Sequence, residues 1–223
     1  MKFTLHTFLL LFTLLTLTSC FDVIDEITLN EDGSGEFLLT VNMSKSKSKL
    51  NSIMLLDSIN GFRVPSKEEI INNLEAWVDY LENSEGLSRV NKTHNFEDFI
   101  FTLGFHFRSV DDINRAIENI NFKNKRSEPL NLKYTYDKKN KRFTRYYEPN
   151  AEDKENYTRV KEKDKQMFNE AIYISICRFK ADVASCTNNK AVISKSGKAV
   201  MLKTPAVTIF QGNNTLTNTI QLK

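Results

Sequence analysis

The chain after residue 20 opens with an alternation of apolar and polar side chains that predicts a β-hairpin. Residues 22–29 and 36–43 place apolar side chains at nearly every second position, and a period of two is typical of a half-buried strand. Between them, residues 30–35 read NEDGSG, a run of turn-forming side chains. We therefore expect two antiparallel strands joined by a short turn.

Four later segments have apolar side chains at the spacing of an amphipathic helix. In the clearest one, Ile70, Leu74 and Trp77 share a stripe, and Ser66 with Glu69 resembles a capping box before it. The stripe favours a core position for Trp77 over a ligand platform. The four predicted helices are residues 49–59, 68–83, 109–120 and the highly charged 150–170.

Further strands are predicted where aromatic and β-branched residues alternate with polar ones. Phe99, Phe101, Phe105 and Phe107 fall on one face of such a segment, and His106 falls on the other. The segments indicate an α+β fold with antiparallel sheets, several amphipathic helices and a β-rich C-terminal region, in one domain over residues 20–223. The further predicted strands are 87–91, 96–107, 130–136, 142–147, 172–179, 191–194, 198–202, 207–210 and 215–222.

Residues 1–19 differ from the rest and have the features of a secretory signal peptide. Lys2 is their only charged residue, and the apolar run that follows is 15 residues long, from Phe3 to Leu17. A helix needs roughly 20 residues to cross a bilayer, so the run is short for a membrane span. We expect this leader to be removed.

The leader ends in Leu17-Thr18-Ser19-Cys20, which resembles the lipobox of bacterial lipoproteins. The resemblance implies that the Cys20 thiol receives diacylglycerol, that the chain is cut before Cys20, and that the new amino group is acylated. Each buried CH₂ contributes about 0.8 kcal/mol, so two or three chains hold a protein stably at a membrane. The competing interpretations are a buried thiol behind a retained helix and a secreted protein cut by the ordinary signal peptidase.

The residue after Cys20 bears on the destination of the mature protein. In enteric bacteria, Asp at this position tends to retain a lipoprotein at the inner membrane, whereas this chain has Phe21. By that analogy we expect a palmitate-bearing protein of the outer membrane. The periplasmic and the surface face both stay open.

Composition and charge exclude several classes of protein. Hydrophobic residues make up 40% of the 223 residues, and 31 basic side chains stand against 28 acidic ones. These values fit a folded body and exclude a wholly disordered chain. The balance also disfavours a nucleic-acid binder, and we interpret the aromatic, basic segment 130–147 as a solvated hairpin rather than a single-strand binding surface.

Cys177 and Cys186 are the two cysteines of the chain beyond Cys20. The envelope of a Gram-negative cell permits disulfides, but a bridge requires Cα atoms within about 7 Å of each other. Because no Gly or Pro between the two residues marks a turn, two interpretations stay open, a disulfide and a pair of partly buried thiols.

The sequence presents no catalytic constellation. His94 and His106 are the histidines of the mature chain, and no His, Cys or carboxylate pair has the spacing of zinc ligands. No G-x-S-x-G elbow is present, and residues 30–35 lack the final Glu of a calcium loop. We predict no catalytic, cofactor-binding or metal-ligating residue.

Two stretches together are similar to a family of uncharacterised, LppM-like envelope lipoproteins. One is Cys20 followed by a strand, the turn at residues 32–35 and a second strand; the other is residues 189–202, NKAVISKSGKAVML. The family usually has Asp or a similar turn former where this chain has Ser196. The resemblance implies an α+β body tethered to a membrane without established catalytic residues, so of the site residues only Cys20 is implied by it.

These observations predict a lipid-anchored envelope protein that binds or assembles with an envelope protein or glycan and is not an enzyme. The alternative is a lipid-anchored hydrolase whose site is assembled from distant residues such as His94 or His106. A third interpretation is binding of a lipid or other apolar ligand between sheet and helices, suggested by the 16 Phe residues. A polar cleft holding a His would favour the hydrolase, and a shallow or apolar groove would favour the binding protein.

Overall fold

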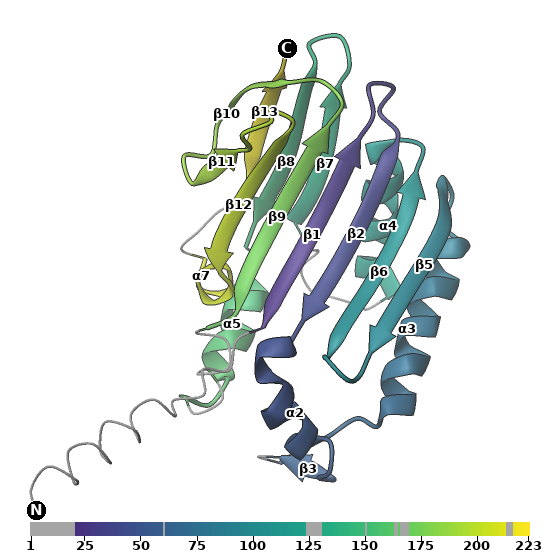
Figure 1. Ribbon diagram of the computed structural model, residues 1–223, viewed down its shortest axis with the longest axis vertical. Helices are drawn as coiled ribbons and strands as arrows, with labels where there is room; N and C mark the ends of the chain where they lie inside the picture. The colour runs from purple at the N-terminus through teal and green to yellow at the C-terminus, as the bar shows by residue number, and fades with distance from the viewer. Residues whose placement is uncertain are drawn as a thin grey trace, which may run out of the picture.

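One large β-sheet organises the part of the chain that the computed structural model describes, namely residues 21–59, 61–123, 131–149, 151–162, 165, 170–212 and 216–223. Neighbouring strands run antiparallel, except that β1 and β9 are parallel. In spatial order (Figure 1), the strands are β11 (Ala191–Ile193), β12 (Ala199–Pro205), β9 (Ile172–Phe179), β1 (Asp22–Leu29), β2 (Gly35–Asn42), β6 (Ile100–Phe107) and β5 (Leu87–Asn95).

The hairpin predicted after residue 20 is confirmed as β1 and β2, which pair along their whole length. The turn is stabilised by Asp32, whose carboxylate accepts hydrogen bonds from the backbone N–H of Ser34 at 3.0 Å and from its hydroxyl. At Gly35 a Cβ atom would lie 2.1 Å from the carbonyl oxygen of Thr28. The second glycine of the turn is therefore required by the close approach of the two strands.

Two groups of elements cover the rear of the large sheet (Figure 1). A smaller sheet lies behind β1, β9 and β12, and two helices lie behind β2, β6 and β5. The most completely buried side chains, among them Phe143 and Tyr134, lie between these layers. The smaller sheet has the order β10 (Val183–Cys186), β13 (Asn218–Leu222), β8 (Arg142–Glu148) and β7 (Asn131–Asp137), and the helices are α3 (Lys67–Glu82) and α4 (Val110–Lys123). The predicted α+β class is confirmed.

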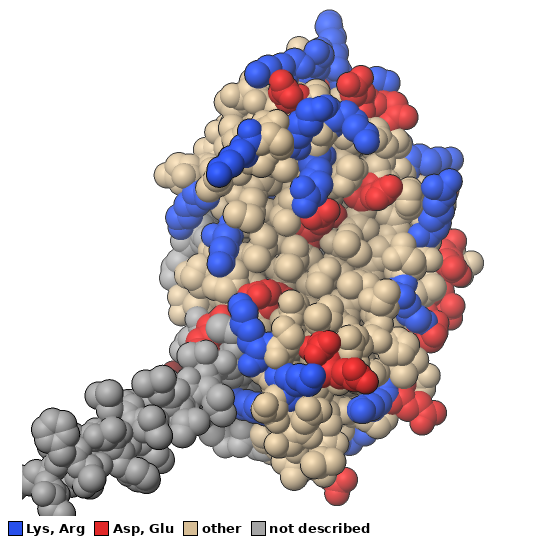
Figure 2. All heavy atoms as spheres, viewed as in Figure 1, with Lys and Arg blue, Asp and Glu red and all other residues tan. Residues whose placement is uncertain are grey.

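The front of the large sheet faces the viewer in Figures 1 and 2 without a covering layer among the described elements. Its middle is largely uncharged, with blue and red side chains mostly around it. Val192, Met201 and Leu38 are exposed there. They lie in one row across the sheet, because each is paired, directly or through the strands between, with the next.

Both long helices begin as the sequence predicts. The Ser66 hydroxyl accepts a hydrogen bond from the Glu69 backbone N–H at 3.1 Å, and the Glu69 carboxylate accepts one from Ser66 N–H at 2.8 Å. This capping box satisfies N–H groups that the helix itself cannot pair. At α4, the Asp112 carboxylate accepts the Ser109 N–H in the same manner. Among the described residues, no helix is both long and apolar enough to cross a membrane.

The structure differs from the prediction in the type of one element and in the extent of another. Residues 207–210, expected as a strand, belong to helix α7 (Ala206–Phe210). A four-residue apolar run fits either element, and the helix is favoured because Ala206 and Ile209, three positions apart, both become buried. The helix expected over 49–59 is α2 (Lys47–Ile53), preceded by a 3-10 turn (Ser44–Ser46). None of the residues of α2 is buried, so no tertiary packing stabilises a longer helix at this point.

The remaining differences arise at turns. Strand β6 begins at Ile100 instead of 96, because the Asn95 side-chain oxygen accepts the N–H groups of Glu97 and Asp98 and closes a turn there. Strand β10 was not predicted, since the turn before it contains neither Gly nor Pro. The predicted helix 150–170 is α5 (Ala151–Arg159), and part of its later half lies outside the described residues.

The long axis of the molecule separates two ends. We call them the anchor end, after the lipid anchor that the sequence predicts at Cys20, and the far end. The anchor end holds the start of β1, helix α2 and the short hairpin β3 (Ser58–Ile59) and β4 (Phe62–Arg63). The far end holds the β1–β2 and β7–β8 turns and the C-terminus (Figure 1).

Candidate functional site

The sequence-predicted site residues are widely separated. Residues 1–19 and Cys20 lie outside the described residues. Cys177 is buried on β9 of the large sheet, and Cys186 is half-buried on β10 of the small one. Both are free thiols in the structure. The structure therefore has the pair of partly buried thiols and not the disulfide.

The two histidines lie on opposite faces of the large sheet. His106 Nε2 lies 3.6 Å from Glu36 Oε1 on the front, and Ser88 is the partner of His106 on the next strand. Glu, His and Ser are the side chains of a hydrolytic triad, but Glu36 is 62% exposed and no hydrogen bond joins His106 to Ser88 among the described residues. A triad acts in a site that excludes water, and this open face does not provide one.

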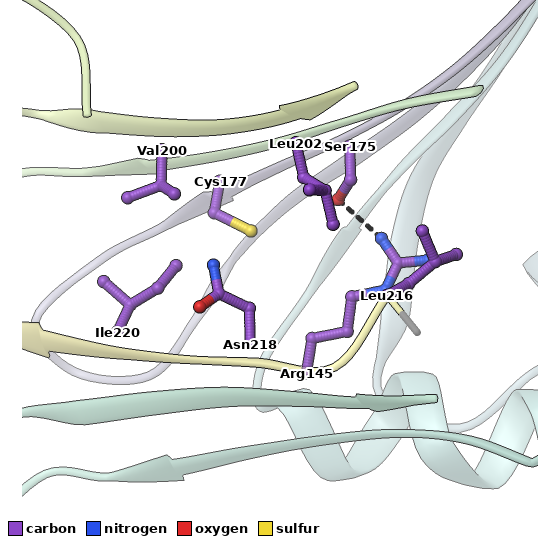
Figure 3. Close-up of a pocket in the computed structure, with 8 residues that line it drawn as sticks. All are labelled: Arg145, Ser175, Cys177, Val200, Leu202, Leu216, Asn218 and Ile220. Atoms are coloured by element: carbon purple, nitrogen blue, oxygen red, sulfur yellow. Dashed lines mark hydrogen bonds between the residues drawn. The ribbon is translucent and has the colours of Figure 1, made fainter. Parts of the chain in front are cut away.

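A buried ion pair joins the two sheets. Arg145 on β8 donates to Asp25 on β1 at 2.6 Å, with side chains only 5% and 7% exposed. The guanidinium also donates to the hydroxyls of Ser175 and Tyr173, and Tyr173 donates in turn to Asp25. Strands β8, β1 and β9 therefore meet at one guanidinium group, and Figure 3 shows its hydrogen bond to Ser175.

Burial and charge fix the protonation states in this cluster. Burial raises the pKa of the Cys177 thiol to about 12, against the opposing effect of Arg145. Burial likewise raises the pKa of Tyr173 well above its ordinary value. For Arg145, burial is the largest effect and lowers the pKa, but Asp25, Tyr134 and Tyr173 together outweigh it, and the pKa lies well above the ordinary value. None of these three groups titrates near neutral pH, so they do not serve as acid or base there.

The hollow beside the ion pair is too small for a substrate. Its volume is about 10 Å³, roughly the space that one water molecule occupies. Figure 3 shows the side chains that point into it from both sheets, including Cys177, Asn218 and Leu202. We interpret the cluster as a structural element of the core.

An apolar groove lies between α3 and the rear of the large sheet. Its volume is about 330 Å³. Trp77 is 41% exposed at its edge, so the predicted core position of this residue is wrong. The groove is lined by Leu39, Val41, Leu74, Trp77, Phe101, Thr102 and Leu103.

Several contacts hold the helical wall of this groove in place. The Tyr80 hydroxyl on α3 donates to the Ala116 carbonyl oxygen on α4 at 2.7 Å, and the Tyr80 ring stands edge-on to Trp77 with centroids 6.0 Å apart. An ion pair between Glu75 and Lys92 ties α3 to β5. The groove is therefore a preformed feature between packed elements, as small-molecule sites usually are.

The groove lies toward the anchor end of the molecule. Val41 on its floor is partnered with Val23, the second residue of β1, and with Phe101 on the other side. The apolar side chains therefore lie almost level with the point where the described chain begins. The spacing of apolar side chains predicted helix α3. No signal in the sequence shows that the sheet does not extend far enough to bury Trp77.

Polar hollows occupy the far end instead. Tyr136 stands between two of them, of about 510 and 310 Å³. The larger is bordered by Lys138, Lys141 and Lys223 as well as Glu31 and Asp32. Hydrogen bonds from Ser34 lower the pKa of Asp32, so this carboxylate is charged at neutral pH. Such a lining suits a polar or charged partner. Within the described residues, no group of His, Cys, Asp and Glu has the geometry of a metal site.

Comparisons with known proteins leave the identity of the chain open. No family model matches the sequence, and no curated protein matches it significantly. Among solved structures, the chain is similar to the folded domain of LppM from Mycobacterium tuberculosis, determined by NMR, with a TM-score of 0.41 and 12% sequence identity over 91% of this chain and 89% of that one. A similarity this weak supports no functional argument.

The ion pair yields the first prediction. Arg145→Met leaves the Asp25 carboxylate buried without its counter-charge and should lower the free energy of unfolding by about 3–5 kcal/mol. Asp25→Leu combined with Arg145→Met removes both charges and should lower it by less than Arg145→Met alone. Urea unfolding followed by circular dichroism measures these two variants and Asp25→Leu alone. A loss in the double variant equal to the sum of the losses in the two single variants would contradict the coupling.

The thiols yield the second prediction. Because Cys177 is buried and its pKa lies near 12, iodoacetamide should modify Cys186 in the native protein and leave Cys177 unmodified at pH 8. Peptide mass analysis reads the modified sites, and unfolding in urea beforehand is the control that exposes both. If both thiols stay unmodified until a reductant is added, the two residues are bonded and the structure is wrong at this point.

Proposed function

We propose that the chain is a lipid-anchored protein of the bacterial cell envelope that binds an acyl chain in the groove beneath α3 and catalyses no reaction. The observation on which the binding function rests is the groove itself, an open recess lined almost entirely by apolar side chains. Covering exposed apolar surface of this kind removes it from water and lowers the free energy. The localisation we propose is the outer membrane, on its periplasmic or surface face.

The start of the body supports the anchor. The Leu17-Thr18-Ser19-Cys20 motif implies lipid on Cys20, and β1 begins at Asp22, two residues later. A chain this short cannot hold the body far from the bilayer. The far end, with its polar hollows around Tyr136, then points away from the lipid, where a protein or glycan partner would meet it.

The position of the groove supports an acyl chain as its occupant. The floor at Val41 is level with Val23, so the recess lies close to the attachment point of the lipid. Membrane lipids are the most abundant apolar molecules at that place.

The anchor has a direct test. Cys20→Ala should abolish metabolic labelling with palmitate and move the protein out of the membrane fraction, because no sulfur remains to be acylated. Cys186→Ser is the matched control and should keep both properties. Continued labelling of Cys20→Ala would refute the anchor.

The groove can be tested with its own fluorophore, since Trp77 is the single tryptophan of the chain. In a form that begins at Phe21, a bromine-labelled long-chain fatty acid should quench Trp77 fluorescence saturably, and the unlabelled fatty acid should compete. Val41→Asp places a charge in the apolar recess and should weaken binding at least about tenfold.

Val192→Asp is the matched control, because Val192 is already exposed on β11, away from the groove. It should bind as the unaltered chain does. Quenching that rises without saturation, or saturable quenching that Val41→Asp leaves unchanged, counts against the groove as the site.

A further inference from the structure

We propose that the tip, which we define as residues 54–59 and 61–63 in the loop and short hairpin after α2, inserts the side chains of Leu55, Leu56 and Ile59 into the lipid surface to which the protein is attached. The proposal rests on the lipid anchor for the orientation of the body. It adds a second, non-covalent contact with the membrane, made by side chains of the folded domain.

The tip presents three apolar side chains to solvent. Leu55 is 87% exposed, the highest value among the exposed large hydrophobic side chains, and Leu56 and Ile59 are 50% and 36% exposed. A monomeric soluble protein gains nothing from such a cluster at the end of a projecting loop. Lipid contact would remove these side chains from water.

Backbone hydrogen bonds hold the tip in this form. The Leu56 N–H donates to the Ile53 carbonyl oxygen at 2.9 Å, and the Val64 N–H donates to the Asp57 carbonyl oxygen at 3.0 Å. Ser58 and Ile59 pair with Arg63 and Phe62. The exposed leucines are therefore presented by a closed loop, so little ordering is needed when they enter the lipid.

The tip lies at the anchor end. It projects from α2 at the lower end of Figure 1, and it is the mostly uncharged lower edge of the molecule in Figure 2. Lys45, which precedes α2, forms an ion pair at 3.1 Å with Asp22, two residues after Cys20. The same end of the body therefore holds both the predicted lipid and the exposed leucines.

The charge of the surrounding segment suits anionic headgroups. Residues 44–67 contain five basic side chains and one acidic side chain, Asp57. Glu68 and Glu69 follow this range directly. Lys45, Lys47 and Arg63 form ion pairs with Asp22, Asp98 and Glu69, whereas Lys49 is exposed on α2. Basic side chains beside an apolar cluster are the pattern of surfaces that lie in the membrane interface.

The front of the large sheet is the rival surface for this contact. It also exposes apolar side chains, Val192 at 59% and Met201 at 40%. An ion pair between Arg178 and Glu26 lies among them. Val192 and Met201 are level with Glu26, four residues along β1 from Asp22. We therefore assign the membrane contact to the tip.

Depth-dependent quenching distinguishes these surfaces. In a Trp77→Phe background, Leu55→Trp and Val192→Trp each place a single tryptophan on one of the two surfaces. The full, membrane-extracted protein is reconstituted into vesicles of phosphatidylcholine and phosphatidylglycerol, in which the phosphatidylcholine is brominated near the headgroup or deep in the acyl chain. The mass of the peptide that contains residue 20 is measured in the same samples.

We expect the Leu55→Trp emission to shift to shorter wavelength and to be quenched most by the shallow bromines, while Val192→Trp is unaffected. Replacing phosphatidylglycerol by phosphatidylcholine should weaken the Leu55→Trp quenching. Quenching of Val192→Trp instead, or of neither variant, overturns the proposal. If the peptide mass shows no lipid on residue 20, the proposed anchor is wrong, whereas the insertion of the tip is judged separately from the quenching.

Discussion

The ion pair between Asp25 and Arg145 is the interaction on which the two-sheet arrangement depends. Each charge is almost completely removed from water, and each is stable only while the opposite sheet is in place. Moving one sheet by a single residue, about 3.3 Å, would separate groups that are 2.6 Å apart. The pair therefore fixes the position of the small sheet, while non-directional packing of rings such as Phe143 supplies the bulk of the burial.

The sequence predicted those elements whose signals are local. The period of two in β1 and β2, and the Ser66 and Glu69 side chains that cap α3, depend on neighbours within a few residues. The error in element type falls where the outcome depends on distant contacts. Residues 207–210 are apolar enough for either structure, and the burial of Ile209 against other elements decides for a helix.

The candidate site was less predictable than the fold for the same reason. The stripe on α3 correctly indicates which residues face the sheet, yet it does not say how far the sheet extends beneath them, so the exposure of Trp77 came only from the structure. The pairing of Asp25 with Arg145 joins residues 120 positions apart, and nothing in either local sequence marks a buried charge. Leu55 and Leu56 read as part of a helix because hydrophobicity alone does not distinguish core from exposed positions.

The parallel neighbour of β1 has a consequence for the order of assembly. Its partner β9 begins at Ile172, so a growing chain makes the central strand long before the strand that completes it. Until then, one edge of the β1–β2 hairpin offers unpaired N–H and C=O groups to any extended chain nearby. Sequence-distant pairing also slows folding. The nascent protein therefore depends on a period of protection from aggregation, which ends when residues 172–179 dock.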